Sequence, residues 1–288
     1  MKQSVHILFF ALFLGITGSA WAEQDGRLSE SNQAMITAKR QKIENEIAQL
    51  KDHPWAGQYY HGDGFGTNVT LTLSPENGFT VTWFGCLGLY DQNHGTVDWD
   101  KSRIKLSFAF DMAKGYTGRY ASEYRPIRWG ERLYLIPTDE IIEFCNAINS
   151  RDEPRMGIHG FFLLRGGGEK KEAKGKPELP EEFMPYLLDE PVKAKIVSVN
   201  KDIQESRLGK VVTVFVDKGK KDGLLPGMEL YVVKSNSGTI YKTIKLTQVD
   251  ETQSEGKFIY ESPYETSSRK TPKPTKGWQL STCPSWRR

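Results

Sequence analysis

The chain has 288 residues, of which 26% are charged, and its formal charge at pH 7 is +3. So small an excess of positive charge argues against a general basic surface for nucleic acid or anionic membranes. The length favours two domains over one.

The first 22 residues have the three parts of a secretory signal peptide. Lys2 supplies the positive charge, residues 7–16 are almost wholly apolar, and a small-x-small exit ends at Ala22. The apolar run is shorter than the about 20 residues of a membrane-spanning helix. We therefore expect cleavage after Ala22 and a soluble periplasmic or secreted bacterial protein. An uncleaved anchor is the alternative.

The segment 23–52 is predicted to contain one helix, at about 33–52. Its apolar residues recur at helical spacing: Ala34, Ile36, Ile43, Ile47 and Leu50. Pro54 ends the pattern, because proline disfavours the helical conformation at the residue before it. This stripe could pack on the following domain or on a second copy of the chain. It covers only about two heptads, so packing within the chain is the expectation.

From Trp55 onward the hydrophobic period changes to two, which predicts an antiparallel sheet with one face on a core. The expected strands are 68–73, 79–83, 95–99, 103–110, 132–136 and 158–164, with a helix near 138–149. Residues 91–95 are interpreted as a polar turn, since they lack the ligand spacing of a calcium loop. The prediction is an α+β domain at 53–166, built on an antiparallel meander.

Alternation also predicts which aromatic side chains are inside this domain. Trp83 shares its face with Phe79 and Val81, which places it in the core. Tyr59 and Tyr60 are adjacent, so one of them should point outward.

The chain has three cysteines, Cys86, Cys145 and Cys283. An odd number in an oxidising compartment allows one internal disulfide and one spare thiol, or three buried thiols. Cys86 and Cys145 fall in one predicted domain, so they are the expected pair. No C-x-x-C occurs, so we expect no cysteine-bound metal.

A flexible basic linker is predicted at 167–190, because residues 165–176 contain no aliphatic side chain except Ala173. Short strands follow with no helix between them, at 192–199, 211–216, 228–233, 240–246 and 256–260, and a last strand within 278–286. The whole sequence is therefore predicted to be mainly β, with a small barrel at 191–288.

Two segments resemble known families. Residues 217–231, with Gly223, Pro226, Gly227 and Met228, resemble a turn of small β-barrel modules in bacterial envelope accessory proteins. This resemblance implies protein contacts and no catalysis. Residues 55–60, Trp-Ala-Gly-Gln-Tyr-Tyr, are similar to the opening of lipocalin-like barrels. That resemblance implies a ligand-binding interior, although the sequence shows too few clear strands for eight and adds a helix.

The glycine-rich segment 61–66 is interpreted as a turn at the mouth of the first sheet. The candidate ligand-binding residues are His61, Asp63, Tyr59, Tyr60 and Tyr90. No Gly-x-Ser-x-Gly or His-Glu-x-x-His motif occurs, so no catalytic residue, metal or cofactor is assigned.

These observations favour an exported, non-catalytic binding or assembly protein of the bacterial envelope, with a protein partner and no nucleic acid. The alternative is a lipocalin-like carrier of a small apolar ligand in the first domain. An envelope hydrolase of unrecognised type is the third possibility.

Overall fold

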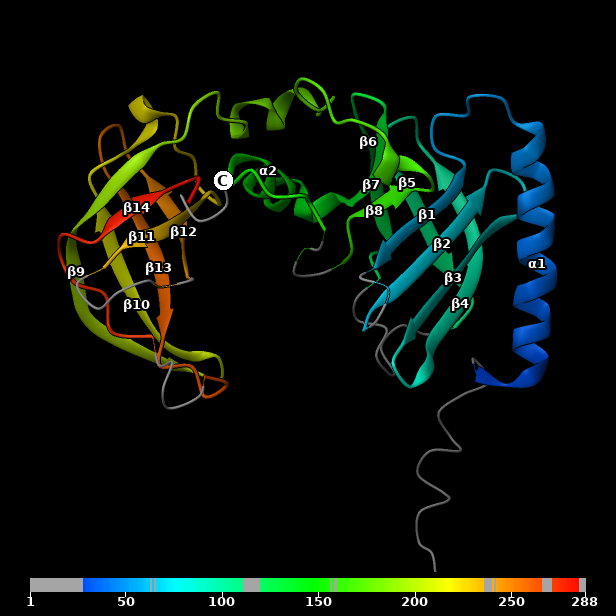
Figure 1. Cartoon of the computed structure of the whole chain (residues 1–288), viewed down its shortest axis with the longest axis horizontal. Coiled ribbons are helices and arrows are strands. Elements are labelled where there is room, and N and C mark those ends of the chain that lie inside the picture. Colours follow the sequence, from blue (N-terminus) through cyan, green and yellow to red (C-terminus); the bar gives the residue numbers. More distant parts are fainter. Residues whose placement is uncertain are drawn as a thin grey trace, which may run out of the picture.

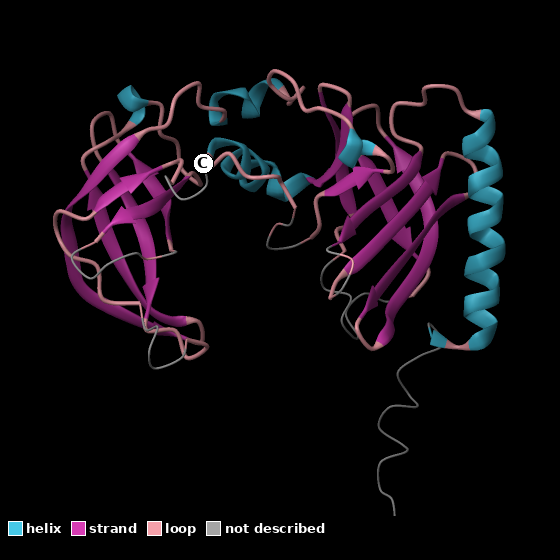
Figure 2. Ribbon diagram, in the orientation of Figure 1, coloured by secondary structure: helices cyan, strands magenta, loops and turns pink. Residues whose placement is uncertain are grey.

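The computed structural model describes residues 28–62, 64, 66–110, 120–155, 157, 160–235, 240, 242–265 and 271–284. It consists of two closed antiparallel β-barrels, with helices between them and beside the first barrel (Figure 1; Figure 2). The mainly β class predicted from the sequence is confirmed. Within the described residues, no helix has the length and apolar character needed to cross a membrane.

The first barrel is an eight-stranded meander in which each strand pairs with the next and β8 closes on β1. Its strands are β1 (Gly57–Gly62), β2 (Asn68–Ser74), β3 (Gly78–Gly85), β4 (Gly88–Trp99), β5 (Ile104–Phe108), β6 (Glu123–Trp129), β7 (Arg132–Pro137) and β8 (Leu163–Arg165). The sheet therefore closes into a barrel, a question that the alternation pattern alone did not decide.

Two features of the first barrel differ from the prediction. The expected polar turn at 91–95 lies within β4, because this long strand carries Asp91 and Asn93 opposite Trp83 and Val81 in the register. Strand β6 was not expected, since Pro126 interrupts its alternation. The set of six expected strands lacks β6 and also β1, which accounts for the difference from eight.

The interior of the first barrel is filled by large side chains. Among the largest fully buried residues here are Trp55, Tyr59, Phe79, Tyr124 and Phe161. The prediction for the adjacent tyrosines is confirmed: Tyr59 is inside and Tyr60 is 40% exposed. Trp83 is also in this core, as its alternation indicated.

Helix α1 (Glu30–Gln49) begins at Ser29, whose side chain accepts a hydrogen bond from Asn32 N. It packs on the outer wall of the first barrel over β2 and β3, so the expectation of packing within the chain is confirmed (Figure 1). Its buried stripe is narrower than predicted and consists of Asn32, Ile36 and Ile43.

One carboxylate fastens the end of α1 to the barrel. Glu46 accepts hydrogen bonds from Ser74 Oγ, from Glu76 N at 3.0 Å, and from Asn77 N and Nδ2 at 3.0 and 2.8 Å. These four donors all belong to the end of β2 and the β2–β3 turn. Burial alone would raise the pKa of Glu46, but the hydrogen bonds outweigh it and hold the pKa below the ordinary value.

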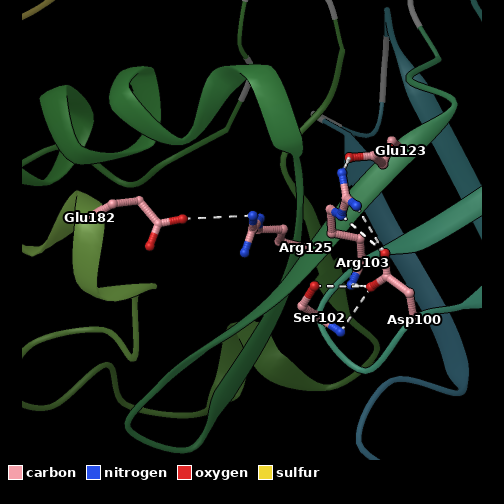
Figure 3. Close-up of polar contacts among 6 residues, drawn as sticks. All are labelled: Asp100, Ser102, Arg103, Glu123, Arg125 and Glu182. Carbon is pink, nitrogen blue, oxygen red and sulfur yellow. Dashed lines mark hydrogen bonds and ion pairs between the residues drawn. The ribbon is translucent and has the colours of Figure 1, made fainter.

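The β4–β5 turn is also held by a carboxylate (Figure 3). Asp100 Oδ1 accepts hydrogen bonds from Ser102 Oγ, Ser102 N and Arg103 N at 2.9, 3.1 and 2.8 Å. Arg103 in turn bridges Asp100 and Glu123, at 3.1 and 3.2 Å. The Ser102 hydroxyl leads the interactions that lower the pKa of Asp100 to about 2.

Helix α2 (Ile141–Asn149) follows the 3₁₀ turn η3 (Thr138–Glu140), close to the predicted helix. It packs against the outer wall of β6 and β7 in a second apolar cluster, whose buried members are Ile127, Tyr134, Ile136, Ile141, Phe144, Cys145, Phe162 and Leu187. The fold therefore has helices on two different parts of the first barrel's wall.

The segment predicted as a flexible linker makes contacts along its length. It contains two 3₁₀ turns, η4 (Gly168–Lys170) and η5 (Glu181–Tyr186). Glu178 N donates to Arg128 O at 2.7 Å, Arg125 lies 3.7 Å from Glu182 (Figure 3), and Leu187 is buried in the α2 cluster. Its apolar residues lie after position 176, beyond the polar stretch from which flexibility was inferred.

The second barrel has the strand order β10-β13-β12-β11-β14-β9. Its strands are β9 (Lys193–Ser206), β10 (Gly209–Val216), β11 (Glu229–Lys234), β12 (Thr243–Val249), β13 (Ser254–Tyr260) and β14 (Gln279–Ser281), and η6 (Lys220–Asp222) follows β10. The core includes Val214, Met228, Phe258 and Trp278. A small barrel was predicted here, and its strands lie close to the predicted segments.

Helix α2 joins the two barrels. Asn146, which is buried, donates from Nδ2 to Gly227 O at 3.0 Å and accepts from Glu229 N at 3.2 Å. Lys245 of β12 pairs with Glu143 of α2. The turn singled out by its resemblance to envelope modules is thus the turn that docks on α2. We call these contacts the inter-barrel joint.

Gly227 is required in the inter-barrel joint for two reasons. Its φ is +89°, a conformation that side chains with a Cβ rarely adopt. A Cβ at this position would also lie 3.2 Å from Ile142 Cγ2.

The predicted Cys86–Cys145 disulfide is not formed. Cys86 is exposed in the β3–β4 connection, whereas Cys145 is buried in α2, on the opposite side of the barrel wall from its core. Burial raises the pKa of the Cys145 thiol to about 12. Cys283 is also buried and donates from Sγ to Ser150 O at 3.6 Å.

Candidate binding groove

A groove of about 720 Å³ lies on the outer wall of the first barrel. It is lined from β1, β2, β7 and β8, by the segment 153–155, and by residues next to η4. Helix α1 covers the wall at β2 and β3, and α2 covers it at β6 and β7. The groove is therefore a strip of wall between the two covered regions.

Strand alternation decides which side chains reach the groove. In β1, Tyr59 points into the core, so Gln58 and Tyr60 point outward. In the short closing strand, Leu163 is in the core and Leu164 faces outward, opposite Tyr60 in the register. The exposed ring of Tyr60 and the half-buried Leu164 give the groove an apolar surface.

A polar network holds one side of the groove. Arg132 Nη1 lies 2.7 and 2.8 Å from the two carboxylate oxygens of Glu153, and Tyr134 OH donates to the same carboxylate at 2.9 Å. Arg132 Nε donates to Lys171 O at 2.8 Å. Burial raises the pKa of Tyr134 to about 12, so its hydroxyl stays a donor at neutral pH. The network fixes the segment around Glu153 against the barrel.

The lining is mixed in character. Arg155 and Glu169 are exposed and bring one charge of each sign, while Gln58 and Thr70 offer an amide and a hydroxyl. Aromatic surface combined with paired donors and acceptors suits an extended amphipathic ligand, such as a peptide segment, better than a wholly apolar molecule.

A smaller cavity of about 140 Å³ lies where the chain enters the barrel. Two of its basic residues have structural partners: Arg165 donates from Nη2 to Ala56 O at 2.6 Å, and His53 Nδ1 accepts from Ala56 N at 2.9 Å. Burial and then the nearby Arg165 lower the pKa of His53, so its ring is neutral at pH 7 and acts as an acceptor. We therefore give the residues around this cavity a structural role, which is to hold the start of β1 in place.

The structure brings together only part of the predicted ligand-binding set. Tyr60 and His61 line the groove. Tyr59 is buried in the core and donates to Trp55 O at 2.7 Å, and its pKa is raised by burial. Tyr90 lies at the β3–β4 hairpin, where its ring stacks edge-on against Trp83. Asp63 lies outside the described residues.

Sequence reasoning missed Arg132, Tyr134 and Glu153. A signal existed for the first two, because they are two residues apart on one strand and so share a face. Glu153 follows α2, and nothing local indicates that it returns to β7. Across the described ranges, no group of three or more histidine, cysteine or acidic side chains could hold a metal ion.

Comparisons with protein families, with characterised proteins and with solved structures found no match for this chain.

Proposed function

We propose that the chain is an exported, non-catalytic binding protein of the bacterial envelope, and that the groove on the first barrel holds an extended segment of a protein partner. The observation that carries the proposal is the strip of wall between α1 and α2, where Tyr60 is exposed beside polar side chains. The signal-peptide pattern of the first 22 residues supports the compartment.

The packing of the first barrel favours this function over a lipocalin-like carrier. A carrier of a small apolar ligand needs an internal cavity of some hundreds of Å³. The interior of the first barrel is instead occupied by large side chains, among them Tyr59, Phe79, Trp83 and Phe161. The rings of Trp83 and Phe161 pack edge to face within this core, with 6.2 Å between their centroids.

Three histidines lie in the part of the chain that the structure describes. His61 lines the groove, where its ring packs on Phe161, and the other two have structural settings elsewhere. His53 accepts backbone hydrogen bonds, as described above. His94 is partly buried, near Lys39 of α1, and its pKa is lowered first by burial and then by this charge. Both rings therefore have a structural setting away from the groove.

Site-specific photo-crosslinking tests the proposal. A photo-crosslinking amino acid is placed at Gln58, which lines the groove, and in a matched control at Gln41, an exposed glutamine on α1. Each chain is irradiated in envelope extract. We expect the same protein adduct repeatedly at Gln58 and not at Gln41, and we expect Tyr60→Ala to reduce its yield.

Two outcomes would overturn the proposal. Adducts that are absent at Gln58, or identical at Gln58 and Gln41, would show that the groove holds no partner segment. A small apolar molecule retained by the purified chain in native mass spectrometry would favour the carrier instead.

A further inference from the structure

The β3–β4 connection exposes apolar side chains to an unusual degree. Leu87 at its tip is 91% exposed and Phe84 is 47% exposed. The nine residues 82–90, Thr-Trp-Phe-Gly-Cys-Leu-Gly-Leu-Tyr, contain no charged side chain. Two-residue hairpin turns usually carry Asn, Asp or Gly, so Cys86-Leu87 is an uncommon choice for a solvated turn. We call residues 84–90 the β3–β4 tip.

The β3–β4 tip has internal contacts that hold Leu87 outward. Gly85 pairs with Gly88 at the end of the hairpin, and Leu87 N donates to Tyr90 OH at 3.3 Å. The ring of Tyr90 lies on Gly85, where an added Cβ would be 2.0 Å from Cε2. The exposed Leu87 therefore belongs to a built hairpin whose backbone N–H at the turn is satisfied.

Other exposed apolar residues lie toward the same end of the first barrel. In a meander, alternate connections lie at alternate ends, so the ends of β1 and β3 are at the same end of the barrel. Figure 1 shows that α1 also begins there. Tyr60 lies near the end of β1, and Leu28 and Met35 lie before and in the first half of α1; all three are exposed.

The tight turns at the opposite end of the barrel are charged. They are the β2–β3, β4–β5 and β6–β7 turns, one of which appears in Figure 3. The charged residues in these turns are Glu76, Asp100, Lys101, Arg103 and Glu131. The β3–β4 tip therefore differs in charge from the comparable turns of the same barrel, and it alone among these four suits an apolar environment.

We propose that the β3–β4 tip contacts a lipid bilayer, with Phe84 and Leu87 inserted at the level of the headgroups and the first acyl carbons. A narrow, convex and uncharged tip with a satisfied backbone group meets the requirements of the membrane interface. The neighbouring Tyr90, which is partly exposed, is a residue type enriched at that level. The nearly neutral chain predicts binding by insertion rather than by attraction to anionic lipid.

Vesicle flotation tests this proposal with the chain from Glu23 onward, the form expected after cleavage. Vesicles of phosphatidylethanolamine and phosphatidylcholine are used with and without phosphatidylglycerol, at low and high salt. We expect the fraction of protein that floats with the vesicles to change little with the phosphatidylglycerol content or with the salt concentration. Leu87→Asp should reduce vesicle binding at least about tenfold.

The second barrel offers a matched control. Leu208 at the β9–β10 turn is 51% exposed, and Leu208→Asp should leave flotation unchanged. Circular dichroism and thermal unfolding establish that both variants are folded, since neither side chain is buried.

Cys86 gives an independent measurement. It is exposed at the β3–β4 tip while Cys145 and Cys283 are buried, so an environment-sensitive dye should react at Cys86 selectively. We expect a blue shift of its emission when vesicles are added. The proposal is overturned if the parent chain does not float, if flotation requires anionic lipid, or if Leu87→Asp floats as well as Leu208→Asp. If the chain does not bind vesicles, and a photo-crosslinking amino acid placed at Leu87 gives a protein adduct in envelope extract, a protein pocket receives the tip instead.

Discussion

Single side chains hold this fold at positions where strand ends meet other elements. Glu46 receives four hydrogen bonds from the end of β2 and the β2–β3 turn, and Asp100 organises the β4–β5 turn in the same manner. Alternation predicted correctly that Trp83 is inside and that one tyrosine of the adjacent pair is outside. It could not predict the partners of Glu46, because these lie about 30 residues away and follow from the docking of α1.

At this residue scale we predict the effect of Glu46→Ala. The substitution removes the carboxylate that accepts all four hydrogen bonds. The free energy of unfolding should therefore fall by about 1–2 kcal/mol at pH 7. The folded-state pKa is lowered, so the contribution is present above the unfolded pKa and is lost as pH falls through the folded pKa. Urea denaturation at neutral and at acidic pH measures both effects.

Glu44→Ala is the matched control, because Glu44 is exposed on the same helix. It should change stability by less than about 0.5 kcal/mol. Equal losses in Glu44→Ala and Glu46→Ala, or a Glu46→Ala loss that does not shrink in acid, would contradict the hydrogen-bonding role given to Glu46.

At the element scale, α2 has two structural roles. One side of it completes the apolar cluster on β6 and β7, and another holds the second barrel through Asn146 and Glu143. The sequence predicted the helix, but not the contact of Glu143 with the second barrel. The pairing of Glu143 with Lys245 joins residues about 100 positions apart, so no local pattern indicated it.

The inter-barrel joint should depend on pH through Glu229. Burial, and then the neighbouring Glu143, raise the pKa of Glu229 from 4.5 to about 7, while Lys245 acts in the opposite direction. Between these two values the folded state holds a proton that the unfolded state has released. The proton held by Glu229 therefore stabilises the folded state. This contribution is complete below the unfolded pKa, declines between about pH 4.5 and pH 7, and is absent above the folded pKa.

Glu229→Gln tests this dependence. The amide cannot ionise, so the variant should match the parent at about pH 4.5 and exceed its stability by about 3 kcal/mol above about pH 7. Urea denaturation at several pH values measures the difference. Glu251→Gln, at an exposed position in the same barrel, should keep the parent's pH dependence. If Glu229→Gln also keeps it, Glu229 is not the titrating group.

At the scale of the whole molecule, the inter-barrel joint makes the barrels one unit. Asn146 satisfies a backbone acceptor and a backbone donor of the second barrel from within α2, and Gly227 allows the close approach. Residues 177–190 strengthen this connection, since Asn149 of α2 donates to Tyr186 O at 2.9 Å. The groove and the β3–β4 tip therefore belong to a body larger than the first barrel.

Asn146→Ala should uncouple the two barrels. Two partly buried backbone groups, Gly227 O and Glu229 N, lose their partner, which costs about 1–3 kcal/mol, and unfolding should separate from one transition into two. Tryptophan fluorescence and far-UV circular dichroism during urea denaturation report the two transitions. Asn149→Ala, on the same helix, should lower stability while keeping a single transition, since its partners are in the connecting segment. Coincident transitions in Asn146→Ala would refute the coupling.

Local pattern along the chain was enough to specify the mainly β class, the two β-rich parts and both α-helices. It also specified that Trp83 is inside and that one of Tyr59 and Tyr60 points outward. These properties follow from local periods of hydrophobicity and from capping, which a sequence displays directly. Three others depend on tertiary packing: the closure of β8 on β1, the strip of outer wall that stays uncovered, and the docking of the Gly227 turn on α2. Each joins segments far apart in the chain, and such packing produces no hydrophobic period that could be recognised in either segment.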